Sequence, residues 1–121
     1  IDIESIVRAI GVKNVRVVDP YDLKATEDAV KEAHDSDELF VIITKQPCAL
    51  IKEVQKRRSD VYCKVNDDKC RKCKSCMKIG CPAIAYKDGR IIIDRSMCNG
   101  CTLCSQMCKF DAIERVGELN E

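Results

Sequence analysis

The first half of the chain alternates between helix-like and strand-like patterns of apolar residues. Asp2 can cap a helix that Gly11 would end. The apolar side chains of this helix recur at helical spacing: Ile3, Ile6, Val7 and Ile10. Residues 15–18 then read as a strand, which Asp19-Pro20 ends.

A second helix and a second strand follow. Asp22 is a good N-cap for the helix. The side chains that we expect to face inward are Leu23, Thr26, Val30 and Ala33. Residues 39–44 predict a strand buried on both faces, because its apolar side chains do not alternate with polar ones. Pro47 suits the first turn of a last short helix, which we expect to run to about Arg57.

This order of elements is typical of a doubly wound parallel sheet. Two strands are too few to cover a strand as apolar as residues 39–44. We therefore expect residues 1–58 to be a piece of a longer α/β domain, with the missing strands upstream in a parent protein or a partner over the surface. The alternative is a self-sufficient small domain with helices on both sides.

The second half, residues 59–121, is an internal repeat with the pattern β-α-β twice. The strands that we expect there are residues 61–65, 84–86, 90–93 and 112–116. Lys87-Asp88-Gly89 is predicted to be the turn between the two halves. The period of the repeat is the step from Cys70 to Cys98.

Each half of the repeat holds a run of four cysteines. The runs are Cys70-x2-Cys73-x2-Cys76-x4-Cys81-Pro82 and Cys98-x2-Cys101-x2-Cys104-x3-Cys108. Three thiolates spaced by two residues can bind three iron corners of a [4Fe–4S] cluster, and in two-cluster ferredoxins the fourth thiolate comes from the other run. The first cluster is therefore assigned Cys70, Cys73, Cys76 and Cys108. The second cluster is assigned Cys98, Cys101, Cys104 and Cys81.

The fold predicted for the chain is α+β. A small α/β segment with parallel strands precedes a bacterial-type two-[4Fe–4S] ferredoxin-like domain. Zinc is the stronger alternative, because pairs of cysteines two residues apart build zinc ribbons, but zinc would leave the third cysteine of each run without a role. A disulfide framework is the weaker alternative, because the N-terminus does not read as a signal peptide.

Composition argues against several other classes of protein. The 121 residues are 34% charged with a formal net charge of +1, so nothing attracts the whole chain to nucleic acid or to a membrane. The longest apolar stretch, residues 39–43, is far short of a membrane span. Iron–sulfur ligands need reduced thiols, which favours an anaerobic cytoplasm. No general-base, nucleophile or phosphate-loop signature occurs.

Charge is distributed unequally around the two runs. The first run is crowded by basic residues: Lys69, Arg71, Lys72, Lys74 and Lys78. The corresponding spacers of the second run carry no charge. Positive charge stabilises a reduced cluster, so we expect the first cluster to have the higher potential, to be the exit for electrons and to attract an acidic soluble ferredoxin. The alternative is a solvated face that merely offsets cluster charge.

Two cysteines lie outside the runs. Cys48 follows Pro47, and a small buried side chain is favoured over a redox-active thiol. Cys63 points from a strand that we expect near the first cluster, where it should pack rather than bind iron.

Nearly the whole chain resembles the C-terminal part of the large subunit of indolepyruvate:ferredoxin oxidoreductases. Residues 2–4 and 15–23 resemble the end of that family's thiamine-diphosphate-binding domain, and Gln46-Pro47-Cys48-Ala49-Leu50 resembles its closing segment. The Cys-x4-Cys-Pro spacing from Cys76 to Pro82 is also similar to that family.

The resemblance implies a part in an enzyme that oxidatively decarboxylates aryl pyruvates with coenzyme A and passes the electrons to ferredoxin. The implied partners are the rest of the large subunit, a small subunit and soluble ferredoxin, with no nucleic acid and no membrane. These residues hold no Gly-Asp-Gly motif, so thiamine diphosphate and Mg²⁺ are expected only in the parent subunit. The alternative function is a free-standing two-cluster electron carrier with an α/β docking module.

Overall fold

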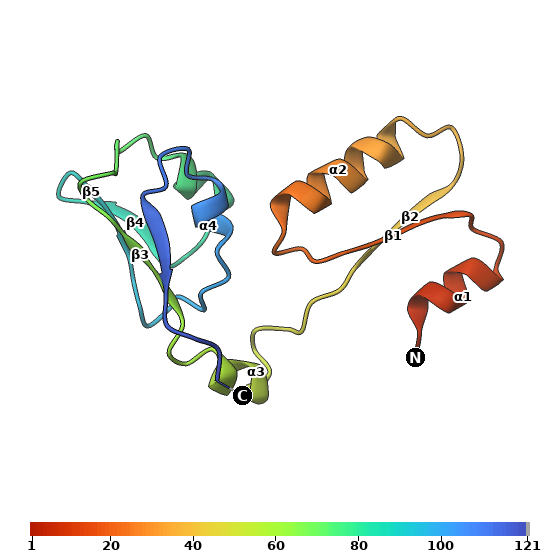
Figure 1. Cartoon of the computed structure of the whole chain (residues 1–121), viewed down its shortest axis with the longest axis horizontal. Helices are drawn as coiled ribbons and strands as arrows, with labels where there is room; N and C mark the ends of the chain where they lie inside the picture. Colours follow the sequence, from red (N-terminus) through yellow and green to blue (C-terminus); the bar gives the residue numbers. More distant parts are fainter. Residues whose placement is uncertain (121) are drawn as a thin grey trace. The chain divides into compact units, whose positions relative to one another are not determined.

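The computed structural model of the chain describes residues 1–120. The chain divides into two compact units, Ile1–Gln46 and Pro47–Glu121 (Figure 1). This division does not decide the domain boundary expected after residue 58, which stays a prediction. Within residues 1–120, no helix is both long enough and apolar enough to cross a membrane.

Aspartate caps set where the two helices of the first unit begin. Helix α1 (Ile3–Ala9) begins after Asp2, whose carboxylate accepts the backbone N–H three residues later at 3.3 Å. Helix α2 (Leu23–His34) begins after Asp22, which caps it in the same way at 2.9 Å. Both predicted N-caps are confirmed.

The two strands of the first unit lie side by side. Strand β1 (Asn14–Val18) pairs in parallel with strand β2 (Phe40–Thr44), and α2 connects the two strands and contacts both (Figure 1). The buried side chains of the unit are Val12, Val15, Val18 and Ala29.

Much of the apolar surface predicted to be buried in this unit is uncovered. The exposed isoleucines of α1 are Ile3, Ile6 and Ile10. Residues 40–43 of β2 are half-buried rather than buried on both faces. Val30 of α2 is exposed, and Ala29 is the buried residue instead, because a small side chain suits the close approach of a helix to a strand pair. Two strands and two helices are too few to cover every apolar face.

Helix α3 (Lys52–Arg57), in the second unit, begins later than the sequence indicated. The sequence places Pro47 in its first turn, but the chain turns first, and the Ile51 N–H donates to the Cys48 carbonyl at 3.1 Å. Ile51 then occupies the N-cap position without a side-chain oxygen that could cap the helix.

Four strands of the second unit form two antiparallel pairs. Strand β3 (Tyr62–Val65) pairs with β6 (Ile113–Val116), and β4 (Ile84–Lys87) pairs with β5 (Arg90–Ile93). The four predicted strands are confirmed to within about one residue at each end. The turn between β4 and β5 also matches, because Asp88 and Gly89 take the positive φ angles that a two-residue hairpin turn requires.

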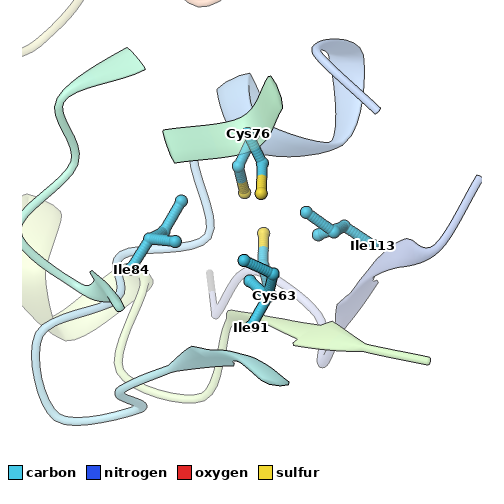
Figure 2. Close-up of a cluster of buried hydrophobic side chains, with 6 residues drawn as sticks. Cys63, Cys76, Ile84, Ile91 and Ile113 are labelled. Atoms are coloured by element: carbon cyan, nitrogen blue, oxygen red, sulfur yellow. The ribbon is translucent and has the colours of Figure 1, made fainter. Parts of the chain in front are cut away.

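One short helix lies in each half of the repeat. The first is the 3-10 helix η1 (Ser75–Ile79), and the second is α4 (Leu103–Gln106), which contacts η1 and β6. The buried core of the unit consists of Cys63, Cys76, Ile84, Ile91, Cys104 and Ile113 (Figure 2). Half of these side chains are thiols, so the core of the fold is also the candidate metal centre.

Candidate metal centre

The two cysteine runs follow the same backbone path. Lys72 and Gly100 occupy the same place in their runs, and both take left-handed φ angles, 55° and 64°. Lys74 and Thr102 are a second matched pair, at 61° and 66°. Non-glycine residues rarely take positive φ, so the match means that the two runs fold as copies of one loop.

The four cysteines assigned to the first cluster line one cavity. Cys70, Cys73 and Cys76 come from the first run, and Cys108 comes from the second. The apolar side chains that share the lining are Val65, Ile91, Phe110, Ala112 and Ile113. The Ala112 N–H donates to Cys108 Sγ at 3.4 Å and holds this sulfur in place. The structure therefore brings a second-run thiol to the first run.

The thiols of this cavity influence one another's ionisation. Burial raises the pKa of Cys76, and the negative charges of Cys108, Cys70 and Cys73 raise it further. Cys73 is exposed, and its hydrogen bond to the Ser75 hydroxyl lowers its pKa. Thiolates so close together repel one another unless a bound cation neutralises them, and metal centres supply that charge.

The cysteines assigned to the second cluster also influence one another's ionisation. Burial raises the pKa of Cys101, and the charges of Cys63, Cys81 and Cys98 raise it further. Cys81 belongs to the first run, so a first-run thiol lies near the second run. Cys104 is buried, and its pKa is raised first by its hydrogen bond to Cys63 and then by burial.

Cys63 is a fifth thiol beside this second group. Its side chain is only 2% exposed, and its backbone N–H donates to Cys98 Sγ at 3.2 Å. Hydrogen bonds to Cys104 and Cys98 lower the pKa of its thiol to about 6. In Figure 2 the Cys63 and Cys76 sulfur atoms point toward each other across the core. The strand pattern marks Cys63 as inward, but periodicity gives no sign that its neighbours are thiols.

The donor sets fit the group that the spacing predicts. Thiolates are the ligands of iron–sulfur clusters, and all ten cysteines are free thiols. Among residues 1–120, no three Cys, His, Asp or Glu side chains converge tightly enough to hold one metal ion. A single Zn²⁺ needs four ligands about 2.3 Å or less from one point. The thiols of the first set line a cavity, which suits a group with several metal atoms.

The basic residues near the first run face solvent. The exposed side chains are Lys69, Arg71, Lys72, Lys74 and Lys78. Lys69 forms an exposed ion pair with Glu114 at 3.1 Å, and Lys74 lies 4.0 Å from the centre of the Tyr86 ring. The Glu114 carboxylate offsets the charge of Lys69, so the positive charge over the first run comes mainly from Arg71, Lys72, Lys74 and Lys78. The surface over the first run is therefore positive, as the sequence indicated.

Comparison with known proteins identifies the chemistry of this unit. A family described as the 4Fe-4S binding domain matches residues 91–114. This match covers the second cysteine run with its flanking strands, so the chain contains a ferredoxin-type iron–sulfur domain.

Whole-chain similarity extends to one enzyme subunit. Indolepyruvate oxidoreductase subunit IorA of Thermococcus kodakarensis is 42% identical over 98% of this chain. The subunit of the same name from Methanothermobacter marburgensis is 35% identical over 98% of this chain. The chain spans 19% of the length of each of these relatives. Pyruvate synthase subunit PorD of Methanocaldococcus jannaschii is 37% identical over 45% of this chain, which corresponds to 65% of that protein.

Gly100 provides a test of the packing behind the second run. An alanine Cβ at this position would lie 2.3 Å from Val61 Cγ1, and Val61 is 1% exposed. We expect Gly100→Ala to lower the free energy of unfolding by roughly 1–2 kcal/mol for the left-handed backbone, plus about 1–3 kcal/mol for the clash. Urea unfolding under anaerobic conditions measures the change.

Gly89→Ala is the matched control. Gly89 has a similar φ of +75°, but no atom lies within 4 Å of the added Cβ. The control should therefore lose the backbone contribution alone. Equal losses in the two variants would contradict the close packing of Gly100 against Val61.

Proposed function

Because this chain belongs over nearly its whole length to the family of indolepyruvate oxidoreductase subunit IorA, we propose that it serves as the electron-transfer part of such a subunit. The observation that carries the proposal is that each of two matched loops in a ferredoxin-type domain has a cysteine of the other loop nearby, which supports an exchange of thiols. Cys108 lines the cavity of the first run, and Cys81 lies within electrostatic reach of Cys101 in the second. This exchange supports two cluster sites rather than one.

In this proposal Cys70, Cys73, Cys76 and Cys108 hold one [4Fe–4S] cluster. Cys98, Cys101, Cys104 and Cys81 hold the other. A bound [4Fe–4S] cluster supplies one-electron transfer at a potential set by hydrogen bonds, charge and solvent exposure.

Residues of this chain would supply the hydrogen bonds and the shielding from solvent that set the cluster potential. The N–H groups of Ala112 and Cys63 donate to Cys108 Sγ and Cys98 Sγ, one bond in each site. Such bonds draw electron density from the thiolates and favour the reduced state. Ile91 and Ile113 are buried beside the first site and keep water away from its thiols.

Uncovered apolar side chains of the first unit support the proposal that this chain is part of a larger subunit. The isoleucines on α1 are exposed and strand β2 is half-buried, so both leave apolar area that further chain could cover. We assign thiamine diphosphate, Mg²⁺ and the coenzyme A-dependent decarboxylation of aryl pyruvates to the rest of the large subunit and a small subunit. This chain would then stand at the C-terminal end of the large subunit and pass electrons outward.

A free-standing electron carrier is the second candidate, because the matched 4Fe-4S binding domain specifies electron-transfer chemistry but no enzyme. In that case the first unit would be a docking module. The coding sequence upstream of Ile1 separates the two candidates. A Gly-Asp-Gly motif in the same reading frame supports the enzyme subunit.

The basic residues over the first run support the proposal that electrons leave the protein from the first site. Positive charge over the first run stabilises a reduced group there, so the first site should have the higher potential and act as the exit to soluble ferredoxin. The alternative, a solvated face with no partner, predicts no dependence of electron transfer on these charges.

Pairs of ligand variants test the exchange of thiols. Cys70→Ala with Cys108→Ala removes two ligands of the same site, so about four iron atoms per chain should remain. Cys101→Ala with Cys108→Ala damages both sites and should leave almost none. If each run instead supplied all four of its own ligands, the two results would be reversed. Iron and acid-labile sulfide analysis of anaerobically purified protein distinguishes the two schemes.

Neutralising the basic surface tests the exit for electrons. Lys72→Gln with Lys78→Gln should slow reduction of an acidic ferredoxin by the chemically reduced protein roughly tenfold at low salt, because electrostatic steering is weakened. Stopped-flow absorbance measures the rate. Lys13→Gln with Lys45→Gln removes the same charge from exposed lysines of the first unit and should change the rate little. Equal effects would indicate that net charge, and not this surface, determines the rate.

A further inference from the structure

We propose that Cys63 is a reserve iron ligand of the second site, able to replace Cys98 when that ligand is lost. The inference rests on the proposed function, because it requires that the second site hold a cluster. It adds a fifth thiol to a site that the cysteine spacing supplies with four.

Position and contacts single out Cys63 among the cysteines outside the runs. Its side chain is almost fully buried in the same core cluster as Cys104, Cys98 packs against that cluster, and the Cys63 backbone N–H donates to Cys98 Sγ at 3.2 Å. Cys48 is exposed and precedes α3, so it is not placed in this way. A thiol packed among two assigned ligands needs little movement to reach an iron that one of them has left.

The internal repeat shows that this position does not need a thiol for packing. Ile91 on β5 lies as far before Cys98 as Cys63 on β3 lies before Cys70. Ile91 is 3% exposed and lines the cavity of the first site together with Cys70. An apolar side chain therefore fills this position at the first site, whereas the second site has a metal-binding side chain.

The replacement of Cys98 by Cys63 as an iron ligand needs neither an oxidant nor a reductant. The bond between iron and Cys98 is absent in a variant that lacks this sulfur, and a bond between iron and Cys63 Sγ forms. The Cys63 thiol releases its proton to solvent. One thiolate replaces another, so the charge of the site and the oxidation states of its irons are unchanged.

Removal of Cys98 in the presence and absence of Cys63 tests the proposal. Cys98→Ala should keep about eight iron atoms per chain, whereas Cys98→Ala with Cys63→Val should keep about four. Electron spin resonance of the reduced protein should show two interacting centres in the single variant and one isolated centre in the double variant. Cys63→Val alone should keep about eight.

The first site provides the matched control in both directions. Cys70→Ala should keep about four iron atoms, because Ile91 offers no thiol. Cys70→Ala with Ile91→Cys should restore about eight, since it gives the first site the arrangement of the second.

The outcomes separate this proposal from the proposed function. If Cys98→Ala kept only about four iron atoms whether or not Cys63 was present, Cys63 would not be a reserve ligand. The proposed function would still stand if the unsubstituted protein held two clusters. Loss of a cluster from Cys63→Val alone would overturn the reserve ligand too, because Cys63 would then be a resident ligand. An unsubstituted protein that binds no iron would overturn both.

Discussion

The pairing of β3 with β6 is the contact on which the arrangement of thiols depends. Strand β3 leads into the first run and β6 follows the second, so their antiparallel pairing brings the end of one run beside the start of the other. Val65 lies opposite Ile113, and the next N–H, that of Asn66, donates to the Ala112 carbonyl at 2.7 Å. Cys108 is carried to the first run by this register. A shift of one residue would turn the inward side chains of β6 outward and separate the thiols.

The thiols make up much of the core of the second unit. Three of its six central buried side chains are cysteines, and neighbouring cysteines surround them. Several thiolates cannot share a low-dielectric interior without a compensating positive charge, as the raised pKa values of Cys76 and Cys101 indicate. Folding and metal binding are therefore expected to be coupled, because the same residues supply the core and the ligands. The isoleucines between the thiols, Ile84, Ile91 and Ile113, are the apolar part of this small core.

The parts of the fold that were predictable from the sequence have local causes. Asp2 and Asp22 cap helices through their own carboxylates, and the strands of the repeat follow from alternation beside turn residues. The late start of α3 was missed because a proline tolerates a helix start without requiring one. The burial of Ala29 in place of Val30 and the thiol neighbours of Cys63 were missed because they depend on tertiary contacts. The ligand assignment came from spacing and stays a prediction, although Cys70, Cys73, Cys76 and Cys108 line one cavity.

Metal and sulfide analysis of the unsubstituted protein, purified without oxygen, is the most direct test of the central claim. The account predicts about eight iron and eight acid-labile sulfide per chain, with electron spin resonance of two interacting centres after reduction. Stoichiometric zinc with no sulfide, or a colourless protein whose cysteines are joined in disulfides, would contradict it.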